Sequence, residues 1–76
     1  MKQPSKLPEI GTKLITHKKL DSENGLMIHP LHIANRKRNA PCTYIGYVPG
    51  HGGDVWWCKH EDGSVAAYSF MEVEFA

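Results

Sequence analysis

The chain has 76 residues, a formal net charge of +1 with neutral histidines, and 41% apolar and 22% charged residues. A domain of this length buries only about 60% of the surface that its unfolded chain exposes, so forming an oligomer would help it to bury more. The composition is that of one folded domain, and it excludes global disorder, a strongly acidic nucleic-acid mimic and an overall cationic field.

The N-terminal half contains one predicted strand and a long connection. Residues 1–9 are polar and proline-containing, and we expect them to form a flexible tail. The alternation over residues 12–16 predicts the first strand. In the connection that follows, Asn24-Gly25 is a hairpin signal. The apolar residues around Pro30 predict at most a short edge strand that the proline interrupts, over residues 26–33.

The C-terminal half is a series of predicted strands separated by turn residues. Its β-branched and aromatic content and its alternation predict strands over residues 42–48, 55–60, 64–70 and 71–75. Residues 49–54 are turn formers throughout, and Gly63 is placed for a left-handed conformation in a tight loop. Five short strands after a long first loop predict an all-β fold, a small SH3-like (Tudor-like) five-stranded barrel over residues 10–76.

The last predicted hairpin can be placed in register from its turn. A three-residue loop over residues 61–63 sets Cys58 opposite Ala66 and Trp56 opposite Tyr68. Face one then carries Trp56, Cys58, His60, Ala66, Tyr68 and Phe70. Face two carries Val55, Trp57, Lys59, Val65, Ala67 and Ser69. Both faces are substantially apolar, so we expect one to pack the barrel and the other to be covered by a partner, a second subunit or the long loop.

Two motifs in this half resemble the plasmid-borne, trimethoprim-insensitive type B dihydrofolate reductases. They are Ile45-Gly46-Tyr47 and Gly63-Ser64-Val65-Ala66-Ala67-Tyr68, where the family has Val-Gly-Trp and Gly-Ser-Val-Gln-Ile-Tyr. The resemblance implies SH3-like barrels that assemble as tetramers around a pore, and it turns face one outward toward that pore. The family's pore glutamine falls on Ala66, which cannot hydrogen-bond a ligand through its side chain, so we expect no reductase activity.

The ending DVWWCKHEDGSVAAYSFMEVEF is similar in style to small accessory proteins of bacteriophages and prophages, which are often SH3-like or Tudor-like barrels with a W-x-x-H-x-D-G-x-x-x-x-Y tail. This resemblance implies a role in host takeover, in which a compact protein binds and inhibits a bacterial host protein. The chain has no membrane-spanning run, no secretory signal and no disulfide framework, so we expect it in the cytoplasm, which is the host cytoplasm if it is phage-encoded.

The sequence offers little for metal binding or catalysis. Zinc needs four tetrahedral ligands, and neither a C-x-x-C nor an H-x-x-x-H spacing occurs. Cys58 and His60 share a strand face about 7 Å apart, which is too far for a direct hydrogen bond between them. The glycine-rich residues 50–53 follow a strand but open no helix. We therefore expect no metal, no cofactor and no enzyme activity.

A binding function is the favoured hypothesis. Trp56 and Trp57 are consecutive in a strand, so one can serve the core while the other is free for an interface. The predicted partner-binding residues are Trp56, Trp57, Tyr68, Tyr47, Arg36, Lys37 and Arg38. The basic loop over residues 36–38 would steer an acidic protein partner.

Two alternatives stay open. The first is a nucleic-acid-binding barrel, whose aromatic side chains stack bases while the basic loop, Lys13, Lys18 and Lys19 contact phosphates. The second is a diverged tetramer of the dihydrofolate reductase type.

Overall fold

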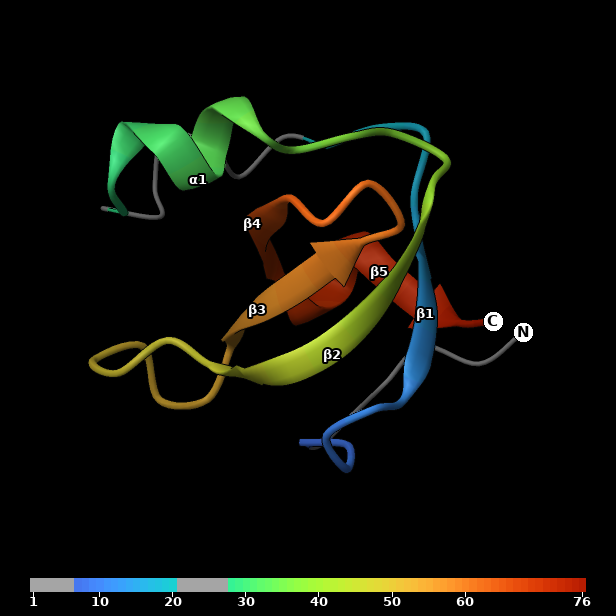
Figure 1. The fold of residues 1–76 in the computed structure, drawn as a ribbon. Helices are drawn as coiled ribbons and strands as arrows, with labels where there is room; N and C mark the ends of the chain where they lie inside the picture. Colours follow the sequence, from blue (N-terminus) through green and yellow to red (C-terminus); the bar gives the residue numbers. More distant parts are fainter. Residues whose placement is uncertain (1–6, 21–27) are drawn as a thin grey trace.

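The computed structural model describes residues 7–20 and 28–76. Within these ranges it contains β1 (Lys13–Thr16), α1 (Pro30–Ala34), β2 (Pro41–Tyr47), β3 (Val55–His60), β4 (Val65–Ser69), the 3-10 turn η2 (Phe70–Glu72) and β5 (Val73–Phe75). The strands form one antiparallel sheet in the order β4-β3-β2-β1-β5 (Figure 1). The predicted all-β class with five strands is confirmed.

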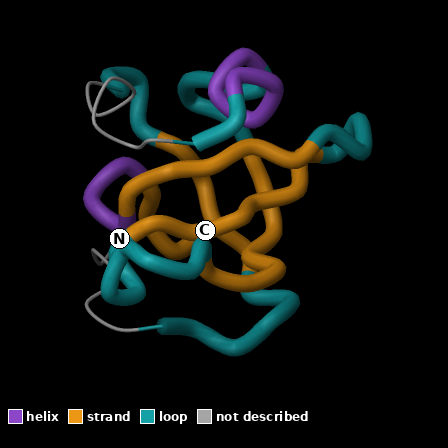
Figure 2. Tube along the Cα trace, turned by 90° about the vertical axis from the view of Figure 1, so that its left-hand side faces the viewer, coloured by secondary structure: helices purple, strands orange, loops and turns teal. Residues whose placement is uncertain are grey.

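The sheet bends around a common interior (Figure 2). Its two edge strands are β4 and β5, which η2 connects, and the described ladder joins them to β3 and β1 but not to each other. The sheet is therefore open rather than closed. In the described part of the chain, no helix has the length and apolar character that crossing a membrane requires.

The register predicted for the last hairpin is confirmed. Trp56 lies opposite Tyr68, and Cys58 lies opposite Ala66. Next to the turn, the backbone N–H of His60 donates to the carbonyl of Ser64 at 2.8 Å. Gly63 adopts φ 88°, the left-handed conformation for which a glycine is suited.

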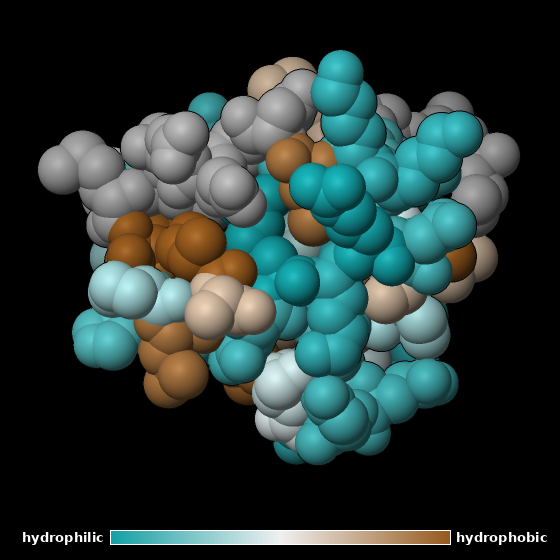
Figure 3. All heavy atoms as spheres, turned by 90° about the horizontal axis from the view of Figure 1, so that it is seen from above, coloured by the Kyte–Doolittle hydropathy of each residue, from teal (hydrophilic) through white to brown (hydrophobic). Residues whose placement is uncertain are grey.

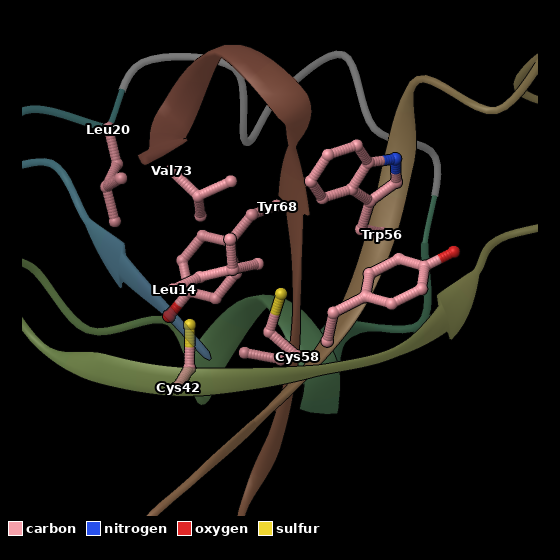
Figure 4. Close-up of a cluster of buried hydrophobic side chains, with 9 residues drawn as sticks. Leu14, Leu20, Cys42, Trp56, Cys58, Tyr68 and Val73 are labelled. Atoms are coloured by element: carbon pink, nitrogen blue, oxygen red, sulfur yellow. The ribbon is translucent and has the colours of Figure 1, made fainter. Parts of the chain in front are cut away.

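Face one of this hairpin is the inside of the fold. Trp56 and Tyr68 are 1% and 0% exposed. The buried core cluster comprises Leu14, Leu20, Cys42, Tyr44, Trp56, Cys58, Ala66, Tyr68 and Val73 (Figure 4). The expectation that face one looks outward is wrong, because the sheet curves toward this face and its large side chains fill the concave side.

Part of face two is covered by the long connection, one of the three covers that the sequence left open. Ile28, just before α1, and Ile33, within it, pack with Trp57 against a second buried cluster. The members of that cluster are Val48, Val55 and Ala67. Viewed from above, hydrophobic side chains gather at the left of the molecule, the side on which α1 lies in Figure 1, while hydrophilic ones cover the middle (Figure 3).

The predicted edge strand around Pro30 is wrong, because Pro30 begins helix α1 instead. A proline suits the first helical position, where its fixed φ is helical and its missing N–H needs no partner. The His29 side chain caps this end by accepting from the backbone N–H of Leu31 at 3.1 Å. The predicted hairpin signal at residues 24–25 lies outside the described residues, as does most of the predicted tail.

Candidate partner-binding surfaces

The predicted aromatic contacts divide between the core and the surface. Trp56 and Tyr68 are buried in the core, so neither presents its ring to a partner. The indole N–H of Trp56 donates to the carbonyl of Gly53 at 2.7 Å. Tyr47 is 51% exposed at the end of β2, whereas Trp57 is half-buried on the outer face of β3. The expectation that consecutive tryptophans serve opposite faces is therefore confirmed.

Tyr68 belongs to a buried polar group that sequence reasoning missed. Its hydroxyl lies 2.6 Å from Nε2 of His60 and accepts from the backbone N–H of Lys37 at 2.7 Å. Burial raises the pKa of Tyr68. The tail pattern W-x-x-H-x-D-G-x-x-x-x-Y contains both His60 and Tyr68, so a signal was present, but nothing in it indicates that they meet inside the fold.

Arg36, predicted to bind a partner, is instead part of the interior. Its guanidinium pairs with Glu72, with side chains 2% and 4% exposed, and lies 5.2 Å from the Tyr68 ring centroid. The other Glu72 oxygen accepts from the backbone N–H of Ser69 at 2.9 Å, completing a capping box. The S-x-x-E spacing of this box is the sequence signal that identifies Glu72.

The rest of the basic loop is at the surface, where only Lys37 has an ionic partner in the described structure. Its ammonium lies 3.3 Å from Asp62 and 3.4 Å from the hydroxyl of Ser64. The Ser64 hydroxyl and backbone N–H, together with Lys37, lower the pKa of Asp62. Arg38 is exposed, and no ion pair engages it within the described residues. The three predicted basic residues therefore differ in what remains available to a ligand.

A first accessible surface lies on the outside of β1, β2 and β3, and we call it the open outer face: Lys13, Thr43, Ile45, Trp57 and Lys59. Lys13 pairs with Thr43 and Thr43 pairs with Lys59 in the ladder, so the three side chains form a row. The Lys13 ammonium donates to the Thr43 hydroxyl at 3.1 Å. The row borders a cavity of about 370 Å³.

The apolar part of the open outer face comes from a bulge in β2. The ladder shifts between Tyr44, which pairs with Cys58, and Gly46, which pairs with Trp57, so Ile45 is the extra residue of the bulge. Ile45 is 36% exposed. The Trp57 ring is fixed on its other side by α1, where the His32 ring centroid lies 4.7 Å away.

A second accessible surface lies where β1 ends, and we call it the basic corner: His17, Lys18, Lys19, Arg38 and Asn39. The backbone N–H of Asn39 donates to the carbonyl of His17 at 3.1 Å, which brings the basic loop beside the end of β1. A cavity of about 430 Å³ opens there. Its lining residues are Ile15, Thr16, His17, Lys18, Lys19, Asn39 and Glu74.

The groups considered for metal binding or nucleophilic catalysis lie elsewhere. Cys42 and Cys58 are free thiols in the core (Figure 4). The hydrogen bond with Cys42, together with burial, raises the pKa of Cys58, so this thiol is not activated as a nucleophile. Across the ranges that the structure describes, no three His, Cys, Asp or Glu side chains are grouped so that they could hold a metal ion.

Comparison with known proteins adds no relative: no family model, no curated protein and no solved structure matches the chain. The fold described above is compatible with a small barrel-like domain. The likeness to the reductases and to phage accessory proteins therefore rests on the quoted motifs alone.

Proposed function

We propose that this domain is a non-catalytic binding module whose open outer face docks onto an acidic surface of a protein partner. The observation that supports the proposal is the position of Trp57, half-buried on the outer face while Trp56 occupies the core. A tryptophan that keeps part of its ring accessible next to exposed apolar area is the kind of residue that dominates binding energy.

Charge complementarity selects the kind of partner. Lys13 and Lys59 are exposed on either side of Thr43, and no ion pair engages either ammonium group within the described residues. Two unpaired cations flanking an apolar centre fit carboxylates flanking an apolar centre on the partner, and such rim charges accelerate association. Glu61 lines the neighbouring cavity, so the partner's carboxylates are expected on the side away from it.

In the same proposal, the partner is a bacterial protein that this module inhibits, as the style of the C-terminal motif implies. Reductase chemistry is not part of it. The position that would carry the pore glutamine, Ala66, is 0% exposed inside the core.

Quantitative affinity capture from a bacterial lysate tests the proposal. The bait is the full chain, compared with a Lys13→Glu/Lys59→Glu variant and with a Lys18→Glu/Lys19→Glu variant that makes the same charge change at the basic corner. We expect proteins captured by the wild type to be lost, by about tenfold or more, only with the first variant. Equal capture of the same proteins by all three baits would contradict the proposal.

The mass in solution tests whether the open outer face binds a second copy of this chain instead of a different protein. If the open outer face joined two copies of the chain, sedimentation would give an oligomer that Lys13→Glu/Lys59→Glu dissociates. That result would replace the proposed partner with a second copy. We expect instead the same mass for the wild type and for this variant at micromolar concentration.

A further inference from the structure

We propose that the basic corner is a separate binding site, which holds the phosphate backbone of a single nucleic-acid strand without reading its sequence. The site uses Lys18, Lys19 and Arg38 as its cations, and it is independent of the open outer face. It goes beyond the proposed protein-binding function, because it lies at the opposite end of β1 from Lys13 and shares no residue with that face.

The first argument is the set of cations that remains once the paired ones are removed. Arg36 is buried against Glu72 and cannot reach a ligand, and the Lys37 ammonium is already paired with Asp62, so neither is counted among the cations of this site. Lys18, Lys19 and Arg38 are exposed, and no ion pair engages them within the described residues. Their ammonium and guanidinium groups are the donors that bind phosphate oxygens in proteins.

The second argument is how the fold brings these cations together. In sequence, Arg38 is far from Lys18, but the strand pairing of β1 with β2 continues beyond the strands. The backbone N–H of Thr16 donates to the carbonyl of Ala40 at 2.9 Å, and the backbone N–H of Asn39 donates to the carbonyl of His17 at 3.1 Å. Asn39 itself adopts φ 55°, the left-handed conformation that asparagine tolerates. The basic loop is thus fixed beside the end of β1.

The third argument is the hollow shape of the corner. Its cavity of about 430 Å³ falls within the range of small-ligand sites, so it can receive one nucleotide unit of a flexible strand. Readers of a duplex insert a helix or β-ribbon into a groove. The described segments that line this corner are the end of β1 and the residues after it, the loop before β2, and β5, and none of them is a helix. A single strand is therefore the better fit.

The lining would hold the strand by its phosphates, which carry no sequence information, rather than by its bases. The exposed aromatic residue Tyr47 lies at the far end of β2, and Trp57 lies under α1, so neither can stack a base held at the corner. Within the described lining, the one ring is that of His17, whose Nε2 lies 3.8 Å from Glu74. The Glu74 carboxylate repels a phosphate placed next to it, so the strand is expected on the Lys18 side.

Fluorescence anisotropy with the full chain and a labelled oligothymidylate of about 15 nucleotides tests the proposal. If three cations contact phosphates, a plot of the logarithm of the association constant against the logarithm of the salt concentration should have a slope of about −2. Affinity should therefore drop roughly twentyfold between about 50 and 200 mM salt. Lys18→Glu/Arg38→Glu should weaken binding by at least tenfold at low salt.

The matched control is Lys13→Glu/Lys59→Glu, which makes the same charge change on the open outer face and should keep binding within about threefold of the wild type. If both variants weaken binding equally, the net charge is responsible and the proposed site is overturned. It is also overturned if no anisotropy change occurs at low salt, if a duplex of the same length binds equally well, or if polyglutamate competes as well as unlabelled oligothymidylate. The lysate capture depends on Lys13 and Lys59, whereas oligothymidylate binding depends on Lys18 and Arg38, so either proposal can fail while the other stands.

Discussion

The Tyr68 hydroxyl lies 2.6 Å from Nε2 of His60, inside the core. The other ring nitrogen of His60 lies 2.9 Å from the carbonyl of Pro41, which can only accept, so Nδ1 donates, and in a neutral ring Nε2 then accepts from the Tyr68 hydroxyl, which also lies 3.3 Å from the carbonyl of Lys37. The same hydroxyl oxygen accepts from the N–H of Lys37. This chain of bonds ties the loop before β2 to strands β3 and β4.

Tyr68→Phe removes the hydroxyl and leaves the Nε2 of His60 and the backbone N–H of Lys37 without this partner. We expect the free energy of unfolding to fall by about 1–3 kcal/mol, measured by urea denaturation. Tyr47→Phe is the control, because the Tyr47 side chain is largely exposed, and its effect should stay within about 0.5 kcal/mol. Equal effects of the two substitutions would show that the buried bond contributes nothing.

Stability at high pH should depend on the same hydroxyl. Burial raises the pKa of Tyr68 in the folded state above the ordinary tyrosine value of about 10, so the unfolded chain loses this proton first. The contribution is fully present below about pH 10 and is lost as the pH rises above it, at a limiting slope of about 1.4 kcal/mol per pH unit. Unfolding free energies from pH 8 upward, compared with those of Tyr68→Phe, check this; identical pH profiles would contradict it.

The two neighbouring cations Arg36 and Lys37 should behave differently. Arg36→Ala leaves the Glu72 carboxylate buried without its partner, and we expect a loss of about 3–5 kcal/mol. Among the described residues, the buried Nε and Nη1 groups of Arg36 have no hydrogen-bond partner, so replacing both members of the pair should cost less than removing one. Lys37→Ala breaks an exposed pair and should leave the melting temperature unchanged within error. Thermal unfolding of the single and paired variants distinguishes these outcomes.

Ala66→Gln tests the face assignment that the reductase resemblance suggested. Because Ala66 faces the core, the longer side chain should destabilise the fold by about 1–3 kcal/mol or more, without creating dihydrofolate turnover with NADPH. Lys59→Gln, on the exposed side of β3, should be neutral. A stable Ala66→Gln protein that binds dihydrofolate would mean that face one is outward after all.

Local pattern predicted much of the backbone. The strands around Trp56 and Tyr68 and their register follow from alternation and from a turn ending in Gly63, because both are properties of neighbouring residues. Helix α1 was not predicted from local pattern. Pro30 is compatible with a strand edge and with a first helical turn, and the choice is made by Ile28 and Ile33 packing onto face two. The capping box from Ser69 to Glu72 is likewise a local feature, because its S-x-x-E spacing is present in the sequence.

Two features of the candidate sites were decided by tertiary structure alone. The sequence determined that Trp56 and Trp57 lie on opposite faces, because a strand has a period of two, but the direction of the sheet's curvature determined which face is inside. Likewise, it determined that the loop over residues 36–38 is basic. Only the fold placed Glu72 against Arg36 and Asp62 against Lys37, because charge pairing depends on distances between residues far apart in the chain.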